Sequence, residues 1–193
     1  MQWQKTIERL RQALTALEVT DKKNMTIAHD QAFLQWQELA TRTRHDRNTV
    51  YLIGNGASAS MASHFAADLA KNGGLHTQVF SDLALITAMG NDIGYDHVFS
   101  EPLKRRMQPG DMLVAISSSG RSPNILRAVE QAEKCHGRVV TLSAMHPANP
   151  LRHAGMLNFY VPVDEYGEAE TSHAAILHHW MDMVGQRFDE TGS

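Results

Sequence analysis

Two short apolar runs in this chain each end in a turn of glycine and serine residues and then open into a helical pattern. The first run covers residues 50–53 and leads into the turn 54–60, and the second covers 112–116 and leads into 117–122. A strand, a tight turn and a helix in this order form the unit from which parallel sheets are built. Because each turn leaves free backbone N–H groups at a helix N-terminus, both segments are also expected to attract a phosphate group.

Strand and helix patterns alternate along the rest of the chain. Strands are expected over residues 50–53, 77–80, 112–116, 139–142 and 156–163. Helices are expected over residues 58–71, 83–89, 99–107, 123–134 and 168–188, with a turn at residues 90–94. This alternation predicts an α/β fold in which a parallel sheet carries helices on both faces.

The first 48 residues have a different pattern and are predicted to form a helical N-terminal arm. Apolar residues recur there at helical spacing, and Thr20 and Asp21 are expected to mark a break and an N-cap between two helices. Such an arm is suited to supporting oligomerisation. No repeat, low-complexity tract or linker interrupts the sequence, so residues 1–193 are predicted to form a single domain with its α/β core at 49–193.

Composition limits the partners and the compartment of the protein. The formal net charge of −3 gives no general attraction to nucleic acid or to an anionic membrane, and neither is an expected partner. No apolar stretch approaches the roughly 20 residues that a membrane span needs. The single cysteine, Cys135, cannot form an intrachain disulfide and fits a reducing compartment, so a cytoplasmic location is expected. Its expected role is packing on a helix rather than catalysis.

The serine-rich turn offers hydroxyl groups that can hold a phosphate without a lysine. Ser117, Ser119 and Ser122 stand where a parallel strand ends, which is the edge at which open α/β sheets bind ligands. The alternative is ordinary turn and N-cap chemistry, for which serine is common. Two equivalent turns favour the ligand. Neither turn matches the Walker pattern or the dinucleotide fingerprint, so the ligand predicted is a phosphorylated small molecule.

Histidine and carboxylate residues on two of the predicted helices could form a metal site. His64 and Asp68 are four residues apart and share a helix face, whereas Glu170 and His178 are eight residues apart, about 80° in azimuth. If the two helices face each other, these four side chains form a mixed nitrogen and oxygen set suited to zinc or a related divalent ion. The alternative is that each histidine is satisfied by a local hydrogen bond.

Taken together, these segments resemble the SIS-domain family, and most of all its sedoheptulose-7-phosphate isomerase (phosphoheptose isomerase) group. The segments that carry the resemblance are Gly54-Asn55-Gly56-Ala57-Ser58, His64, Asp68, Gly90-Asn91-Asp92, Ser117-Ser118-Ser119-Gly120-Arg121-Ser122-Pro123-Asn124, Glu170, His173 and His178. The resemblance implies a flavodoxin-like three-layer α/β/α SIS domain. It also implies a homotetramer whose active sites lie between subunits, and an aldose–ketose isomerase that acts through an enediol.

The resemblance also implies a role for each matching residue. Those expected to bind the substrate are Asn55, Gly56, Ala57, Ser58, Asn91, Asp92, Ser117, Ser118, Ser119, Ser122 and Glu170. Zinc is expected on His64, Asp68, Glu170 and His178, with Asp68 as the base and His178 as its acid/base partner. The substrate implied is sedoheptulose 7-phosphate, which the family converts to D-glycero-D-manno-heptose 7-phosphate for heptose in bacterial lipopolysaccharide or capsule.

Two residues depart from the family pattern. Asp68 stands where the best-characterised enzymes have glutamate, and Glu170 stands where they have glutamine. Aspartate is shorter by one methylene, whereas the extra carboxylate strengthens cation binding and disfavours a second nearby anion. Two other functions stay open: a non-catalytic SIS-domain regulator that binds a sugar phosphate or a replication initiator, and an isomerase of another phosphosugar.

Overall fold

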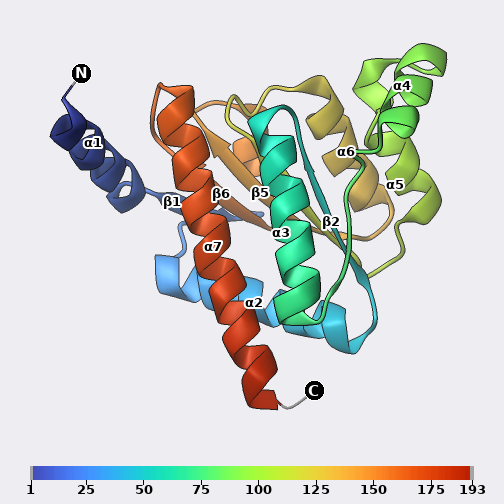
Figure 1. Ribbon diagram of the computed structural model, residues 1–193, viewed down its shortest axis with the longest axis horizontal. Helices are drawn as coiled ribbons and strands as arrows, with labels where there is room; N and C mark the ends of the chain where they lie inside the picture. Colours follow the sequence, from blue (N-terminus) through green and yellow to red (C-terminus); the bar gives the residue numbers. More distant parts are fainter. Residues whose placement is uncertain (1, 192–193) are drawn as a thin grey trace.

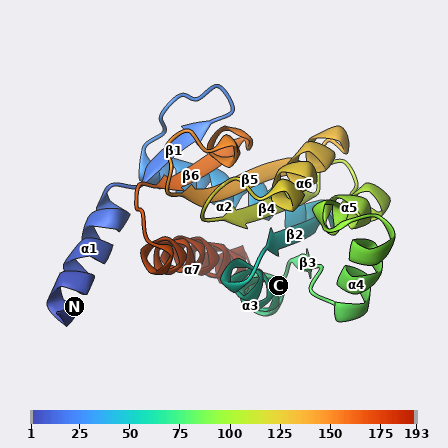
Figure 2. The same cartoon turned by 90° about the horizontal axis from the view of Figure 1, so that it is seen from above.

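The computed structural model describes residues 2–191, in which a six-stranded sheet lies between two layers of helices (Figures 1 and 2). The strands are β1 (Glu18–Asp21), β2 (Thr49–Gly54), β3 (His76–Gln78), β4 (Met112–Ser117), β5 (Arg138–Ala144) and β6 (Leu157–Val161). The helices are α1 (Trp3–Thr15), α2 (His29–His45), α3 (Ala57–Gly73), α4 (Leu83–Asp92), α5 (Ser100–Arg106), α6 (Pro123–Lys134) and α7 (Tyr166–Thr191). Two short 3₁₀ helices, η1 (Tyr95–His97) and η2 (Pro150–His153), complete the fold.

The order of the strands confirms the predicted flavodoxin-like fold. The sheet runs β1-β6-β5-β4-β2-β3, and the five strands from β2 to β6 are parallel. Numbered among themselves these five have the order 2-1-3-4-5, in which the direction of winding reverses between β2 and β4. Because Gly54 pairs with Ile116 at that point, the turns that follow β2 and β4 lie side by side at the carboxyl edge of the sheet.

Apolar side chains fill both sides of the sheet. Helices α2, α3 and α7 cover one face, where the rings of Trp36 and Trp180 stack with centroids 4.0 Å apart. Helices α5 and α6 cover the other face, where Leu113 of β4 and Ile125 of α6 belong to the same buried cluster. All six residues of β4 are buried, which explains why this strand reads as a continuous apolar run in the sequence.

The N-terminal arm differs from the prediction because it contains a strand. Residues 18–21 do not form a break and an N-cap; they form β1, which pairs antiparallel with the edge strand β6. Val19 is fully buried there, and the Asp21 carboxylate accepts hydrogen bonds from the backbone N–H groups of Lys23 and Met25, which fixes a turn. Residues 1–48 therefore contain two helices, as predicted, and the break expected between them is instead a strand, which adds one antiparallel edge to the parallel sheet.

The expected turn at residues 90–94 begins later than predicted. Helix α4 continues through Gly90 to Asp92, and the chain leaves it at Ile93 and Gly94. Gly90 has an ordinary helical conformation, whereas Gly94 has a positive φ of 117°, so the second glycine makes the turn. As a result Asn91 and Asp92 lie on the last turn of a helix rather than in a loop.

Helix α1 projects away from the rest of the molecule (Figures 1 and 2). Arg9 ties it to α7 through an ion pair with Glu168 at 2.6 Å. Its far end exposes large apolar side chains, since Trp3 is 73% and Ile7 44% accessible to solvent. No helix within residues 2–191 has the length and apolar character required to cross a membrane.

Candidate functional site

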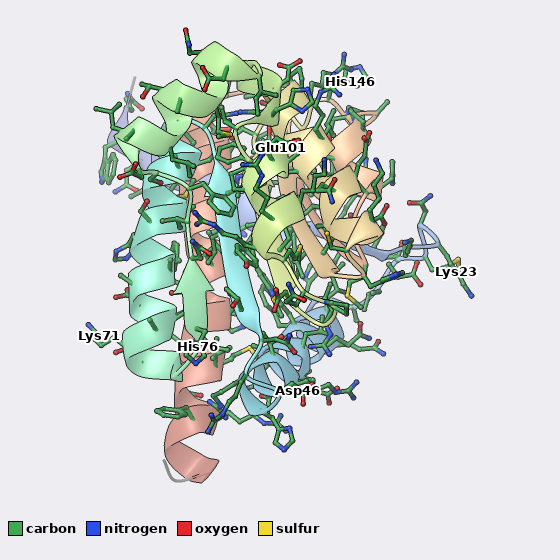
Figure 3. All side chains as sticks on the ribbon, turned by 90° about the vertical axis from the view of Figure 1, so that its right-hand side faces the viewer. Lys23, Asp46, Lys71, His76, Glu101 and His146 are labelled. Atoms are coloured by element: carbon green, nitrogen blue, oxygen red, sulfur yellow. The ribbon has the colours of Figure 1, made fainter. Side chains whose placement is uncertain are left out.

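The two turns predicted to bind a ligand meet at one end of the sheet. Figure 3 shows His146, directly after β5, at this end, and Asp46 and His76, which lie near the amino ends of β2 and β3, at the other. A cavity of about 180 Å³ opens between the turns, and we call it the serine cavity. It is lined by Asn55, Ser58, Ile116, Ser117, Ser118, Ser119, Ser122, Tyr166 and Glu170.

Few hydrogen bonds within the protein occupy the serine hydroxyls that line the cavity. Ser122 occupies the N-cap position of α6 but makes no side-chain capping bond, and its Oγ lies 3.4 Å from Ser117 Oγ. Ser119 Oγ accepts a hydrogen bond from the Arg121 N–H at 3.3 Å. Gly56, which has no side-chain hydroxyl, takes the N-cap position of α3. Capping therefore does not account for Ser122, and the N-termini of both helices keep N–H groups available for an anion.

The serine loop is held in shape by an asparagine that the sequence analysis missed. Asn149 is fully buried and donates from Nδ2 to the carbonyl oxygens of Ala144 and His146, at 3.2 and 3.0 Å. It packs directly against Gly120, whose φ is +60°; a Cβ at Gly120 would lie 1.9 Å from Asn149 Oδ1. Only glycine fits this position. The signal in the sequence was the Asn149-Pro150 pair, which is typical of a turn.

A pair of amides joins the two turns that are predicted to bind a ligand. Asn55 Nδ2 donates to Asn124 Oδ1 at 3.0 Å, and Asn124 Nδ2 donates to Asn55 Oδ1 at 2.9 Å. The Tyr95 hydroxyl donates to the same Asn55 oxygen at 3.1 Å. Asn124 belonged to the motif that carried the family resemblance, but neither it nor Tyr95 was given a role, because their partner lies 69 and 40 residues away.

The charge of the serine cavity comes from a single carboxylate. Among the residues that the structure describes, Glu170 is the one charged residue that lines this cavity, and no lysine or arginine does so. A phosphate there would be held by hydroxyl and backbone N–H groups at the starts of α3 and α6 rather than by an ion pair. The phosphate would also have to lie apart from the Glu170 carboxylate, because two neighbouring anions repel each other.

The other predicted acid/base and metal residues form a second group, farther along α3 and α7, which we call the histidine cluster. His64 Nε2 lies 3.3 Å from Asp68 Oδ2, and the rings of His64 and His178 have centroids 5.8 Å apart. His178 also packs edge-on against Phe65 at 4.7 Å. The predicted facing of the two helices is thus observed for three of the four proposed ligands.

Glu170 does not join the histidine cluster. It lies eight residues before His178 on α7, a rise of about 12 Å, and the ten residues from Ser58 to Asp68 on α3 span about 15 Å. Glu170 and Ser58 therefore sit at the level of the serine cavity, and Asp68 and His178 lie well below it. In the part of the chain that the structure describes, no three His, Cys, Asp or Glu side chains are close enough together to hold a metal ion.

The remaining predicted binding residues lie outside the serine cavity. Asn91 and Asp92 are exposed at the end of α4, where Asn91 Nδ2 donates to Asp92 Oδ1 at 2.8 Å. Gly56 lines a neighbouring cavity of about 260 Å³ that also contains Asn55 and Tyr95. Ala57 begins α3 and is exposed. A single chain thus brings together the phosphate residues and leaves the expected sugar-hydroxyl residues apart.

His173 has a structural environment unlike that of the other histidines on α7. It is fully buried, and its Nε2 bonds the Ser143 carbonyl oxygen at 3.2 Å, which ties α7 to the end of β5 one turn below Glu170. Burial lowers the pKa of His173 from 6.5 to about 4, against a smaller opposing effect of this hydrogen bond. His173 is therefore neutral at pH 7 and positions the helix that carries Glu170.

Comparison with known proteins gives consistent matches. Residues 8–144 match the model of the SIS domain family. The phosphoheptose isomerase of Campylobacter concisus is 34% identical over 157 residues, covering 78% of this chain and 82% of that protein. The phosphoheptose isomerase of Sulfurimonas denitrificans is 37% identical over 147 residues, covering 73% of this chain and 74% of that protein. The solved structure of a phosphoheptose isomerase from Francisella tularensis superposes with a TM-score of 0.81 at 26% identity, covering 95% of this chain and 96% of that one.

Proposed function

Because the chain belongs to the SIS-domain family and is similar to its phosphoheptose isomerases, we propose that it converts sedoheptulose 7-phosphate into D-glycero-D-manno-heptose 7-phosphate. The observation that carries the proposal is the serine cavity, which presents uncommitted hydroxyls between the N-termini of α3 and α6. This cavity lies at the switch point of the sheet, where open α/β folds bind their ligands. The proposed setting is the cytoplasm, in the supply of heptose for bacterial surface glycans.

The serine cavity anchors the phosphate, and proton transfer requires a second group of residues. In the proposed reaction a base removes the proton from C1 of the ketose, an enediol forms, and a proton returns to C2. Asp68 is proposed as the base and His178 as its acid/base partner. Both lie below the serine cavity of their own chain, about 15 Å along α3 from Ser58 in the case of Asp68.

This separation supports a site completed by a second subunit. We include in the proposal a homotetramer in which Asn91, Asp92 and the histidine cluster reach sugar atoms held by a neighbouring chain. The exposed α1 supports such an assembly, since Trp3 and Ile7 form an apolar surface on a helix that projects from the molecule (Figure 2). Substrate-binding residues left apart in one chain would then share one site.

A divalent metal, with zinc as the first candidate, is part of the proposal. The chemistry of His64, Asp68, Glu170 and His178 fits such an ion, since imidazole and carboxylate are its usual ligands. A bound metal would polarise the substrate carbonyl and stabilise the enediolate. His64, Asp68 and His178 would hold it from the histidine cluster, whereas Glu170 lies at the cavity and would have to approach from there.

The experiment is a turnover assay combined with a thermal-shift titration. Purified protein is incubated with sedoheptulose 7-phosphate, with and without added zinc, cobalt or nickel, and the heptose product is measured. In parallel, sugar phosphates and inorganic phosphate are titrated, because a ligand that binds the folded state raises its melting temperature by mass action. We expect turnover, and a smaller shift for Ser122→Ala than for Ser60→Ala, an exposed serine outside the cavity. No turnover with any metal, and no stabilisation by the substrate, would refute the proposal.

A further inference from the structure

In this structure the Asn55 amide makes hydrogen bonds to two neighbours, Asn124 and Tyr95. A carboxamide has two N–H donors and one oxygen with two lone pairs. Asn55 Oδ1 accepts from Asn124 Nδ2 at 2.9 Å and from the Tyr95 hydroxyl at 3.1 Å, so both lone pairs are occupied. One N–H donates to Asn124 Oδ1 at 3.0 Å, which leaves the second N–H. Since Asn55 lines the serine cavity, it has a donor, and no acceptor, to offer a ligand there.

This arrangement selects the kind of substrate atom that Asn55 can meet. A hydroxyl can turn to serve a donor or an acceptor, but a carbonyl or enediolate oxygen can only accept. A donor held in a fixed orientation stabilises a substrate oxygen most when negative charge develops on that oxygen, because the donor does not have to reorganise during the reaction. The Asn55 N–H is therefore best matched to the oxygen that becomes negative in an isomerisation.

We propose that Asn124 and Tyr95 are positioning residues that hold the Asn55 amide as a donor to the substrate oxygen on which the enediolate charge forms. The inference rests on the proposed function. When the base takes the C1 proton, the electrons of that C–H bond form the C1–C2 double bond, and the carbonyl electrons move onto the C2 oxygen. Asn55 stabilises this oxygen without giving up its own proton. The C2 oxygen then gains a proton to complete the enediol, and the C1 hydroxyl loses its proton to the acid/base pair. As a proton returns to C2, the electrons on the C1 oxygen form the new carbonyl at C1.

The burial of Asn124 explains why it can hold the Asn55 amide in this way. Asn124 is 2% exposed, so water does not compete effectively for its amide. Its place is fixed because it follows Pro123 in the first turn of α6, directly beside the serine loop. The same pair of hydrogen bonds thus sets the orientation of Asn55 and its distance from the phosphate-binding serines.

The principal test is Asn124→Asp, which is nearly isosteric. The new carboxylate can still accept from Asn55 Nδ2 but cannot donate to Asn55 Oδ1, so the amide loses its fixed orientation. We expect kcat to fall about 10- to 100-fold, as for the loss of an oxyanion donor or somewhat less. The affinity for inorganic phosphate should fall by a smaller factor than kcat, because the new charge repels both ligands whereas only the substrate also loses the fixed donor. Asn72→Asp, an exposed amide near the end of α3, is the matched control and should leave kcat unchanged.

A phosphorylated hydroxamate, which carries an oxyanion in place of the enediolate, separates positioning from structural damage. Asn124→Asp should weaken its binding by about the same factor as kcat, because both report one interaction, while phosphate binding is weakened by a smaller factor. Damage to the loop would weaken both ligands equally and would overturn the inference. Tyr95→Phe, which removes an exposed hydroxyl, replaces Asn124→Asp as the test if the Asn124 variant does not fold. The kcat of Tyr95→Phe should fall about two- to fivefold.

Two further outcomes are decisive. Full activity of Asn55→Asp would show that the atom facing the cavity accepts rather than donates, and unchanged kcat in both Asn124→Asp and Tyr95→Phe would overturn the positioning role. In either case turnover by the wild type would leave the proposed function standing. Absence of turnover in the wild type would refute the proposed function itself, and this inference with it.

Discussion

The serine cavity and the histidine cluster are built in opposite ways, although α3 and α7 contribute to both. At the serine cavity Ser58, Ser117 and Asn124 are buried, and glycine geometry and buried amides fix the backbone. At the histidine cluster His64 and His178 are exposed, and the contact between His64 Nε2 and Asp68 Oδ2 lies at the surface. Lys71 Nζ lies 3.9 Å from Asp68 Oδ1. Lys71 itself points outward from α3 (Figure 3).

The difference indicates which part of the site one chain completes by itself. A loop whose backbone is fixed by buried hydrogen bonds and close packing is rigid before its ligand arrives, whereas exposed side chains on a helix surface adopt their final geometry only with a partner. The proposed phosphate end of the site is therefore preformed in one chain, whereas under the proposal the acid/base end is completed by a metal, a substrate or a second subunit. Changes in the first region should affect stability, and changes in the second should affect binding alone.

The largest effect is expected for Gly120→Ala in the serine loop. The new Cβ would lie 1.9 Å from Asn149 Oδ1 at a residue whose φ is +60°, so Asn149 must move and lose its bonds to Ala144 and His146. We expect the free energy of unfolding to fall by about 4 kcal/mol. Chemical denaturation measures it.

Gly90→Ala is the matched control for this substitution. Gly90 lies inside α4, and nothing occupies the space within 4 Å of its added Cβ. The free energy of unfolding of Gly90→Ala should be unchanged or raised by up to about 1 kcal/mol. Equal stability of the two alanine variants would contradict the claim that the serine loop is rigidly preformed.

The next effect in size is acid sensitivity through His173, which anchors α7 beside the cavity. The pKa of His173 is about 4 in the folded protein and 6.5 in the unfolded chain, so between these values the unfolded chain binds a proton that the folded protein does not. Stability contributed by neutral His173 is complete above pH 6.5 and is lost as the pH falls towards 4. The shift corresponds to about 3 kcal/mol.

His173→Gln tests this origin because glutamine can still donate to the Ser143 carbonyl and does not titrate. Denaturation curves between pH 4.5 and 7.5 should show a shallower loss of stability for His173→Gln than for the wild type. His45→Gln, an exposed histidine at the end of α2, should leave the wild-type slope unchanged. If the free energy of unfolding fell equally with pH in all three proteins, other groups would cause the acid sensitivity.

The sequence predicted the sheet and the serine loop because both depend on local patterns. Residues 50–53 and 112–116 are buried on both faces, and such strands read as uninterrupted apolar runs. Strand β1 escaped prediction because it is four residues long, carries Glu18 and Asp21, and gains its stability only from pairing with β6. Edge strands of this kind have little signal of their own.

The candidate site was predictable in its residue types and less so in its arrangement. The helical spacing placed His64 and Asp68 on one face, and the structure brings His178 to them. The separation of Glu170 from His178 follows from their eight-residue spacing on α7, whereas the level at which His64 and Asp68 lie beside α7 depends on how the two helices align, which no local pattern encodes. The bonds from Asn124 and Tyr95 to Asn55 escaped notice for the same reason, since they join residues far apart in the chain.

The smallest effect on stability is expected for His178→Ala in the histidine cluster. His178 is exposed, and its ring makes T-shaped contacts with the rings of Phe65 and His64, so without metal the free energy of unfolding should change by less than about 0.5 kcal/mol. Added zinc should distinguish the histidine cluster from the serine cavity. At a concentration 100 times its Kd, zinc should stabilise the wild type by about 2.7 kcal/mol, and His178→Ala should lose most of this gain.

His179→Ala is the matched control, because it removes the adjacent exposed histidine, whose ring packs on Phe33 at 4.6 Å instead of facing α3. Zinc should stabilise this variant as much as the wild type. Equal stabilisation of both alanine variants would remove His178 from the metal site, and no stabilisation of the wild type would remove the metal from the proposal. In the latter case the histidine cluster would remain an acid/base pair open to solvent, and its completion would have to come from a second subunit alone.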